Sequence, residues 1–248
     1  MTSPDELLEL FADAARAVQR AVDRVPIADR RLRTPRPGQY ALDLVADEVA
    51  CRVLARAGVR IVSEESGVHD APEGAITVVL DPVDGSTNCS RQIPYWATSI
   101  CALDADGLLA GLVVNQATGA STTAVRGGGA FRDGTRLEAS HVYRVEESMI
   151  YVTGLPVEVL PWKQFRSLGS AALGLCEIAA GALDGLLDAG GFHAPWDYLA
   201  GYLACLEAGA VVRDAGGRDL VTDDIGARRR LVAAGTAELA DALMRGAR

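Results

Sequence analysis

The chain has 248 residues, 49% of them hydrophobic, and a formal net charge of −9. This composition is enough for one large core or two closely packed sub-domains and differs from that of a disordered chain. Because no basic stripe is available to neutralise a phosphate backbone, the charge disfavours a nucleic acid as partner, and Arg228, Arg229 and Arg230 are interpreted as a solvated face.

The cysteine spacing and the apolar segments indicate the cell compartment in which the chain is expected. Five cysteines are scattered along the chain without any Cys-x-x-Cys pair, which indicates neither a disulfide framework nor a zinc site and favours a reducing cytoplasm. The N-terminus lacks a basic region followed by an apolar stretch, and Glu177 and Asp184 interrupt the most apolar window, residues 170–187. We therefore expect neither a signal peptide nor a membrane span.

Two helices are predicted at the start of the chain. Ser3, followed by Pro4 and Glu6, is typical of a capping box, and the helix should run to about Arg24. Residues 26–38, rich in Arg and Pro, predict a loop. The second helix follows, with an apolar face predicted from its spacing: Leu42, Val45, Val49 and Val53.

Strands are predicted next. Residues 60–63 predict a short strand that is followed directly by Glu64 and Glu65. Residues 76–80 predict a buried strand that stops at Asp81-Pro82. Residues 96–103 and 108–114 predict a β-hairpin, and further strands are expected up to residue 124 and over residues 149–152. The first half should therefore consist of helices covering an antiparallel sheet.

After Pro161 the pattern alternates between helix and strand. Helices are predicted over residues 170–182 and 197–208, and strands over residues 183–188 and 211–214. This alternation is typical of a layered α/β arrangement. We expect an N-terminal α+β half, residues 1–140, and a C-terminal α/β half, residues 141–248.

The segment from Asp81 to Asn88, Asp-Pro-Val-Asp-Gly-Ser-Thr-Asn, contains the most informative chemistry. Two acids three positions apart can hold a hard cation such as Mg²⁺, and the Gly-Ser-Thr amides at a helix start can bind a phosphate. Local chemistry alone leaves an alternative open, in which Asp81 and Asp84 only form an Asx-turn and a helix N-cap.

This octapeptide resembles the Asp-Pro-x-Asp-Gly-Thr-x-Asn signature of the inositol monophosphatase family. A second family signature, Trp-Asp with small residues and then Glu-Ala-Gly, is similar to residues 196–201 and 207–209. Residues 63–66, 128–131 and 166–171 resemble further family segments. The resemblance covers roughly residues 40–240 and implies an α/β fold, the layered α-β-α-β-α sandwich of the sugar-phosphatase type.

The resemblance also implies a magnesium-dependent phosphomonoesterase that uses a metal-activated water. It places the ligands of two Mg²⁺ ions at four carboxylates and one backbone carbonyl: Glu64, Asp81, Asp84, Asp197 and the carbonyl of Val83. A third ion would bind through Glu64. Ser86 together with Glu64 would orient the water, and Asp43 would either hydrogen-bond a metal-bound water or serve as a plain acid at a helix start.

On the substrate side, the resemblance implies that the amides of Gly85 and Ser86 hold the phosphate. Ala171, Asp188 and Asp197 would face the alcohol. Some positions depart from the family pattern: Tyr40 replaces a threonine, Arg33 and Arg36 replace a loop lysine, Ser86 replaces a threonine, and Cys89 replaces a phenylalanine. Cys89 is interpreted as a core residue, and the three histidines as structural or surface groups.

Inositol monophosphate is the default substrate that the resemblance implies. Fructose 1,6-bisphosphate, histidinol phosphate and 3′-phosphoadenosine phosphate stay open, because the fold does not determine the alcohol. A hypothesis of another class is a weakly catalytic homologue that binds metal and a phosphorylated effector or a protein partner. The resemblance further implies a homodimer and inhibition by lithium.

Overall fold

Residues 3–72 and 76–247 are described by the computed structural model, which contains six α-helices and two sheets in that part of the chain. The helices are α1 (Pro4–Arg24), α2 (Ala41–Leu54), α3 (Ser86–Arg91), α4 (Ala171–Ala179), α5 (Pro195–Glu207) and α6 (Ala237–Gly246), with short 3-10 turns η1 (Ala55–Ala57) and η2 (Val145–Glu147). None of the described helices is long and apolar enough to cross a membrane.

The larger sheet has eight strands in the order β2-β1-β3-β4-β5-β6-β7-β8. They are β1 (Arg60–Ser63), β2 (Gly67–His69), β3 (Thr77–Asp84), β4 (Ala97–Asp104), β5 (Gly107–Asn115), β6 (Ser121–Val125), β7 (Gly129–Arg132) and β8 (Thr135–Arg136). All neighbouring pairs are antiparallel except β1 and β3. The predicted hairpin is confirmed as β4 and β5, and the predicted antiparallel sheet is confirmed with one parallel pair.

The smaller sheet has five strands in the order β10-β9-β11-β13-β12. They are β9 (Met149–Thr153), β10 (Gln164–Arg166), β11 (Gly185–Asp188), β12 (Val211–Asp214) and β13 (Leu231–Ala234). The helix and strand predicted over residues 170–188 are present but shorter, as α4 and β11. Residue 140, after which the sequence predicts a boundary between two halves, lies between β8 and η2.

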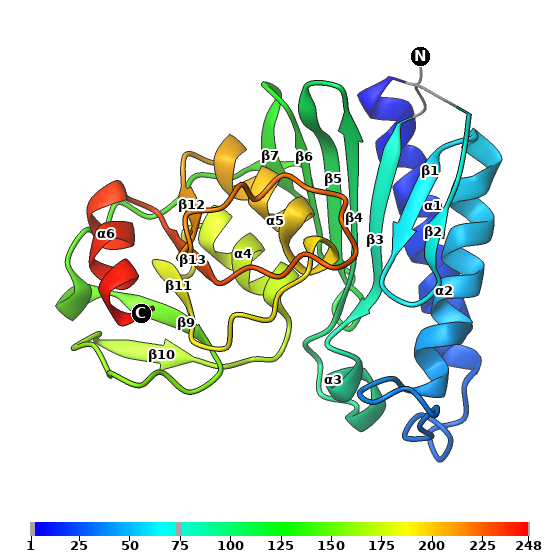
Figure 1. Ribbon diagram of the computed structural model, residues 1–248, viewed down its shortest axis with the longest axis horizontal. Coiled ribbons are helices and arrows are strands. Elements are labelled where there is room, and N and C mark those ends of the chain that lie inside the picture. The colour runs from blue at the N-terminus through cyan, green and yellow to red at the C-terminus, as the bar shows by residue number, and fades with distance from the viewer. Residues whose placement is uncertain (1–2, 73–75, 248) are drawn as a thin grey trace.

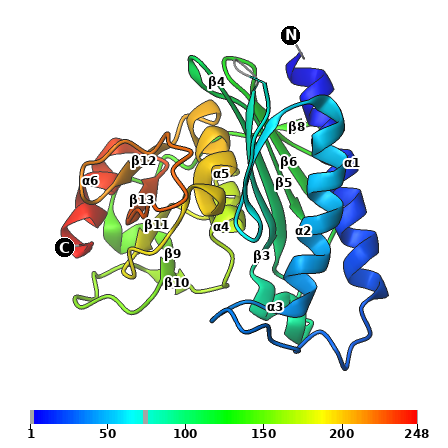
Figure 2. The ribbon, with the colours of Figure 1, turned by 45° about the vertical axis from the view of Figure 1, so that its right-hand side comes forward.

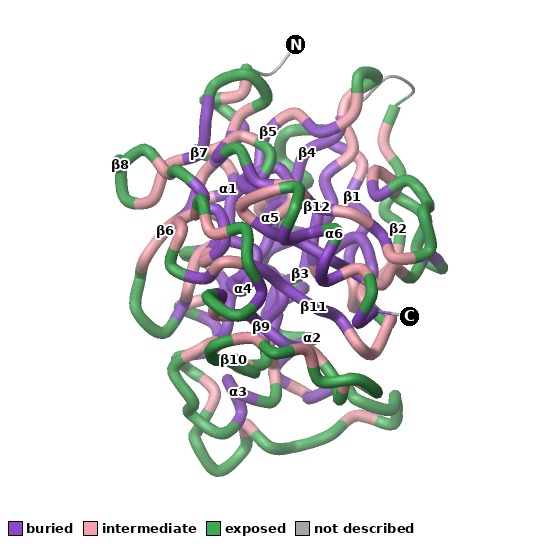
Figure 3. Tube along the Cα trace, turned by 90° about the vertical axis from the view of Figure 1, so that its left-hand side faces the viewer, coloured by how far each residue is buried: buried purple, intermediate pink, exposed green. Residues whose placement is uncertain are grey.

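Figure 1 shows five layers from right to left: α1 and α2, the large sheet, α4 and α5, the small sheet, and α6. The layered sandwich that the resemblance implied is therefore confirmed. The buried part of the trace follows the two sheets and the α4–α5 layer between them (Figure 3). The N-terminal ends of α4 and α5 lie in this middle layer, where they can meet the large sheet.

The first helix forms as its sequence predicts. Glu6 N donates to Ser3 Oγ at 3.2 Å, and Ser3 N donates to Glu6 Oε2 at 2.7 Å, which completes the capping box. The helix ends at Arg24, as expected. Its buried side chains include Leu7 and Phe11, which belong to the same apolar cluster as residues of α2 and the large sheet. Figure 2 shows α1 and α2 side by side on one face of that sheet.

The prediction for the buried face of α2 is wrong in part. Leu42 is buried, but Val45 is 42% exposed and Val49 and Val53 are only partly buried. The face that packs between α1 and the sheet consists of apolar or small residues and two acids: Leu42, Asp43, Ala46, Asp47, Ala50, Cys51 and Leu54. Alanines let α2 approach the sheet closely, whereas an acid here must have a polar partner inside the protein.

Strand β3 also differs from its prediction, because it continues through Pro82 to Asp84 instead of ending at residue 80. Its pairing with β4 shifts by one residue between Asp81 and Asp84, where Pro82 has no N–H to donate. In a regular strand, residues three apart point to opposite faces; the extra residue of the bulge brings the two aspartates to the same face.

Candidate metal and phosphate site

Three carboxylates from distant parts of the chain converge beside the large sheet. Glu64 follows β1, Asp81 lies in β3, and Asp197 lies in the first turn of α5; one oxygen of each lies within 4.8 Å of the others. Glu64 N donates to the carbonyl of Leu80 at 3.1 Å, so the parallel β1–β3 pairing extends to the site. The structure thus brings together three of the four acids expected as metal ligands.

The fourth acid, Asp84, is held against the start of α4. Its Oδ2 accepts from Ser170 Oγ at 2.6 Å and from Ala172 N at 2.8 Å, and the residue is 9% exposed. Ser170 also caps α4 by accepting from Leu173 N. The family-like segment over residues 166–171 contains Ser170, but nothing in the sequence alone assigns it a contact with Asp84.

Burial and mutual repulsion dominate the electrostatics of these acids. Burial, followed by the neighbouring charge of Asp197, raises the pKa of Glu64 well above its ordinary value. Burial and then the charge of Glu64 do the same to the pKa of Asp81, and burial raises the pKa of Asp197 to about 7. A bound cation would remove this repulsion, and an all-oxygen donor set suits a hard cation such as Mg²⁺.

Asp197 is oriented by the helix that carries it. Pro195 begins α5, and Asp197 Oδ2 accepts from Ala194 N at 2.6 Å, which satisfies one of the free amides at the helix start. An acid at this position is also favoured by the helix dipole. One carboxylate oxygen of Asp197 lies within 4.8 Å of oxygens of Glu64 and Asp81.

The segment from Asp81 to Ser86 forms a tight connection between β3 and α3. Val83 N donates to Asp81 Oδ1 at 2.9 Å, and Gly85 caps α3 with a φ of +94°. A Cβ at Gly85 would lie 2.9 Å from the carbonyl oxygen of Gly169. Glycine is therefore required for both its backbone conformation and its contact with the segment before α4.

Asp43 borders a small cavity of about 140 Å³, which is lined by Arg36, Pro37, Gly38, Gln39, Asp43, Glu64, Glu65 and Ser86. Asp43 Oδ2 accepts from Tyr40 N at 2.8 Å, but its buried Oδ1 has no partner among the described residues. Burial raises the pKa of Asp43 to about 7. A buried acceptor of this kind needs a donor such as a water molecule.

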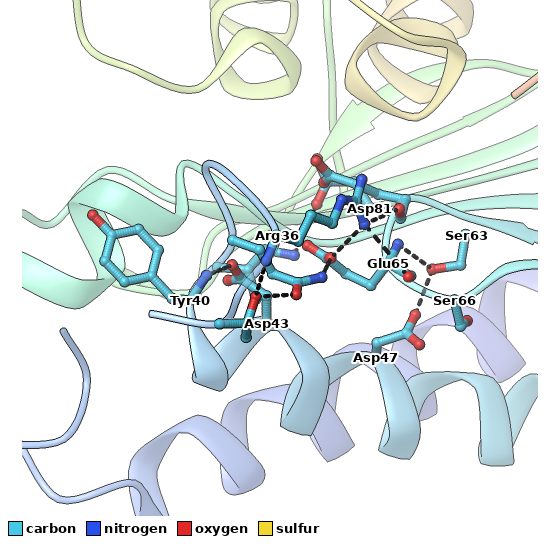
Figure 4. A network of polar contacts seen from close by, with 12 residues as sticks. Arg36, Tyr40, Asp43, Asp47, Ser63, Glu65, Ser66 and Asp81 are labelled. Carbon is cyan, nitrogen blue, oxygen red and sulfur yellow. Dashed lines mark hydrogen bonds and ion pairs between the residues drawn. The ribbon is translucent and has the colours of Figure 1, made fainter. Parts of the chain in front are cut away.

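The loop before α2 is tied to the end of β1 (Figure 4). Arg36 Nη1 donates to the Glu64 carbonyl at 3.1 Å and to Glu65 Oε2 at 3.1 Å, and Gln39 also donates to Glu65. Arg33 lies 3.8 Å above the Tyr40 ring and donates to its hydroxyl. The two arginines that depart from the family pattern thus hold this loop in place.

The two residues expected to face the alcohol from α4 and β11 lie in different surroundings. Ala171 is buried at the first position of α4, next to Ser170. Asp188 is also buried, and its two oxygens accept hydrogen bonds from Thr153, Gly190, Gly191, His193 and Leu231. The carboxylate of Asp188 is therefore committed to contacts inside the protein. Cys89 is fully buried, and burial raises the pKa of its thiol to about 12, which agrees with a core residue.

A model of the inositol monophosphatase family matches residues 39–248. The chain belongs to this family. It is 34% identical over 239 residues to a fructose-1,6-bisphosphatase/inositol-1-monophosphatase of Archaeoglobus fulgidus, with 91% of each chain covered. It is 35% identical over 207 residues to the Nus factor SuhB of Salmonella typhimurium, covering 75% of this chain and 76% of that one.

The fold agrees with solved structures of similar proteins. A hypothetical protein from Pyrococcus horikoshii, described as having similarities to inositol-1 monophosphatase, superposes with a TM-score of 0.88 at 26% identity and covers 98% of this chain and 99% of that chain. Together, the family match and the relatives with phosphatase names support a phosphatase function toward phosphorylated sugars or cyclitols.

Proposed function

We propose that the chain is a Mg²⁺-dependent phosphomonoesterase of small sugar or cyclitol phosphates. One observation carries this proposal: oxygens of Glu64, Asp81 and Asp197 lie within 4.8 Å of one another, with Asp81 buried and the other two partly buried. Such a concentration of acids suits divalent cations. The proposed ligands are those acids together with Asp84 and the carbonyl of Val83, for two ions or, with the Asp43 cavity, three.

Each residue of the site has a proposed task. When bound, Mg²⁺ would lower the pKa of a water and offset the charge of the phosphate. Glu64 and the hydroxyl of Ser86 orient that water, and Asp43 Oδ1 accepts a hydrogen bond from water in the adjoining cavity. The amides of Gly85 and Ser86 hold the phosphate, while Ala171 and Asp197 border the alcohol. No cysteine or histidine nucleophile is needed.

Inositol monophosphate is the proposed default substrate. Fructose 1,6-bisphosphate is the first alternative, because the relative from Archaeoglobus fulgidus is named for both activities. Histidinol phosphate and 3′-phosphoadenosine phosphate complete the set to be compared. We also expect a homodimer in a reducing cytoplasm; the five cysteines are unpaired and buried, in agreement with that compartment.

A second candidate function comes from the relative named Nus factor SuhB. In that case the chain would bind metal and a phosphorylated effector or a protein partner with little turnover. Convergence of Glu64, Asp81 and Asp197 within 4.8 Å, with Asp84 retained in the same strand as Asp81, favours the enzyme.

Phosphate release from the four esters, with and without Mg²⁺, tests the proposal. We expect Mg²⁺-dependent release that falls by two orders of magnitude or more in Asp84→Asn, because loss of the charge weakens cation binding. Asp106→Asn removes an exposed aspartate in the β4–β5 turn and is the matched control. Wild-type rates in Asp84→Asn would overturn the metal assignment, and release from none of the esters would favour the second candidate.

A further inference from the structure

A second, larger cavity lies between the C-terminal half of α2 and the hairpin of β1 and β2. Its volume is about 550 Å³, and it shares no lining residue with the smaller cavity beside Asp43. Ala55 and the buried side chains of Val59 and Ile61 give it an apolar wall. A cavity of this size can hold a small organic molecule, and none of the described residues assigned to the metal and phosphate site lines it.

Asp47 places a carboxylate in the wall of this cavity. It lies one turn after Asp43 in α2 and is only 5% exposed. Its Oδ1 accepts from Ser63 Oγ (Figure 4) and, at 3.5 Å, from Cys51 Sγ. Its Oδ2 has no hydrogen-bond partner in residues 3–72 and 76–247. The donors on Oδ1 orient the carboxylate, so that Oδ2 is an acceptor in need of a donor.

The charges around the cavity favour a cation. The lining side chains include three carboxylates, of Asp47, Glu48 and Asp70, and one guanidinium, of Arg52. Arg52 pairs with Glu48, and both of these side chains are more than 60% exposed. No arginine or histidine of the described residues forms an ion pair with Asp47. A buried carboxylate without a counter-ion is unfavourable, so a ligand that brings a positive charge and N–H donors suits it better than a neutral or anionic one.

We propose that this cavity binds a primary ammonium compound with a short apolar chain, and that Oδ2 of Asp47 accepts a hydrogen bond from the ammonium group. The ammonium supplies both the donor and the positive charge that Asp47 lacks. The chain contacts the apolar wall formed by Val59 and Ile61. The inference goes beyond the proposed phosphatase function and does not depend on it, because the two sites share no described residue.

Titration with three compounds of the same chain length tests the class of ligand. The probes are n-butylammonium chloride, n-butanol and sodium butyrate, and amide chemical shifts of the labelled full chain report where each one binds. We expect saturable shifts in residues 47–71 with n-butylammonium. The neutral and anionic compounds should bind at least tenfold more weakly, because they lack the charge-assisted hydrogen bond to Asp47.

Two pairs of variants test the position of the ammonium. Asp47→Asn keeps an acceptor for Ser63 but puts an amide in place of Oδ2, so it should raise Kd for n-butylammonium at least tenfold. Its matched control is Asp13→Asn, which removes the same charge from an exposed site in α1 and should leave Kd unchanged.

The second pair leaves Asp47 in place. Ala55 and Ala57 are both exposed in η1, but only Ala55 lines the cavity. Ala55→Lys can place its own ammonium in the cavity and should raise Kd about as much as Asp47→Asn does. Ala57→Lys adds the same charge outside the lining and should keep the wild-type Kd.

The outcomes decide the proposal in either direction. Loss of n-butylammonium binding in Asp47→Asn and Ala55→Lys, with both controls unchanged, supports it. Equal binding of n-butylammonium and n-butanol, or a wild-type Kd in Asp47→Asn, overturns it. Shifts confined to the surroundings of Glu64, Asp81 and Asp197 also overturn it, because the ammonium would then bind the acids of the metal site instead.

Discussion

At the scale of single residues, the aspartates of the site share one arrangement. One oxygen of each is held by the protein: Asp81 Oδ1 by Val83 N, Asp84 Oδ2 by Ser170 and Ala172, and Asp197 Oδ2 by Ala194 N. The other oxygen of each has no hydrogen-bond partner among the described residues. Donors that hold one oxygen orient the other, which is how surrounding groups tune a metal ligand.

Ser170 allows this arrangement to be tested. Ser170→Ala removes the 2.6 Å hydrogen bond to Asp84 and the N-cap of α4, so it should lower the free energy of unfolding by about 1 kcal/mol and weaken Mg²⁺ activation by about 10- to 100-fold. The measurements are thermal unfolding and the Mg²⁺ concentration at half-maximal activity.

Thr236→Ala is the matched control, because Thr236 caps α6 in the same way but lies in no contact with the acids. It should lower stability to a similar extent and leave Mg²⁺ activation unchanged. Equal Mg²⁺ activation in the two variants would contradict the orienting role of Ser170.

At the scale of elements, the sequence predicts best where a local signal decides the structure. The capping box and apolar spacing determine α1, and a short polar turn determines the β4–β5 hairpin. The buried face of α2 is not predictable in this way, since packing against α1 and the sheet decides it. Strand β13 has four buried residues with no alternation, and it too depends on its neighbours.

The residues of the site divide in the same way, into those that the sequence predicts and those whose contacts depend on packing. The signatures place four carboxylates on strand ends and helix starts, and the structure brings three of them within 4.8 Å. By contrast, Ser170, Arg36 and Glu65 make contacts that depend on which elements meet in space. The hydrogen bond between Asp188 and His193 likewise depends on the turn between β11 and α5, whose shape no local sequence pattern predicts.

Gly85 tests how the element junction at α3 supports the site. Gly85→Ala meets both a φ of +94° and a carbonyl oxygen 2.9 Å away, so the β3–α3 connection must shift relative to α4. We expect a loss of stability of more than about 2 kcal/mol together with a loss of activity.

Gly209→Ala provides the comparison, because Gly209 has a φ of +87° but no atom within 4 Å of the added Cβ. The strained backbone conformation alone should lower the free energy of unfolding by about 1 kcal/mol, and activity should stay near the wild-type level. Denaturant unfolding and phosphate release measure the two effects. A similar loss of activity in both variants would show that the contact with Gly169 is unimportant.

At the scale of the whole molecule, the layered arrangement of helices and sheets brings the residues of the site together. The strand ends of the large sheet and the N-terminal ends of α4 and α5 meet between the first and third layers (Figure 1). Residues as far apart in the chain as Glu64 and Asp197 thereby bring carboxylate oxygens within 4.8 Å of each other. Burying several acids together is unfavourable for folding unless a cation or protons neutralise them.

The unfavourable free energy of burying these acids predicts how the stability of the metal-free protein depends on pH. Burial raises the pKa of Asp43 and Asp197 to about 7, and it raises the pKa of Glu64 and Asp81 well above the ordinary range. Carboxyls of the unfolded chain titrate near pH 4. Between about pH 4 and pH 7 the folded protein therefore binds more protons than the unfolded chain, so its stability falls as pH rises.

In the presence of a chelator, the midpoint of thermal unfolding should thus fall by about 5 °C between pH 5.5 and pH 7.5. Saturating Mg²⁺ binds the ionised acids of the folded state, so it should raise the midpoint most at the higher pH and remove much of this fall. Asp197→Asn, which takes one of these charges away, should flatten the metal-free curve and reduce the effect of Mg²⁺. A metal-free midpoint that rises over this range, or an Mg²⁺ effect that is larger at pH 5.5 than at pH 7.5, would contradict the assignment of these buried acids as cation ligands.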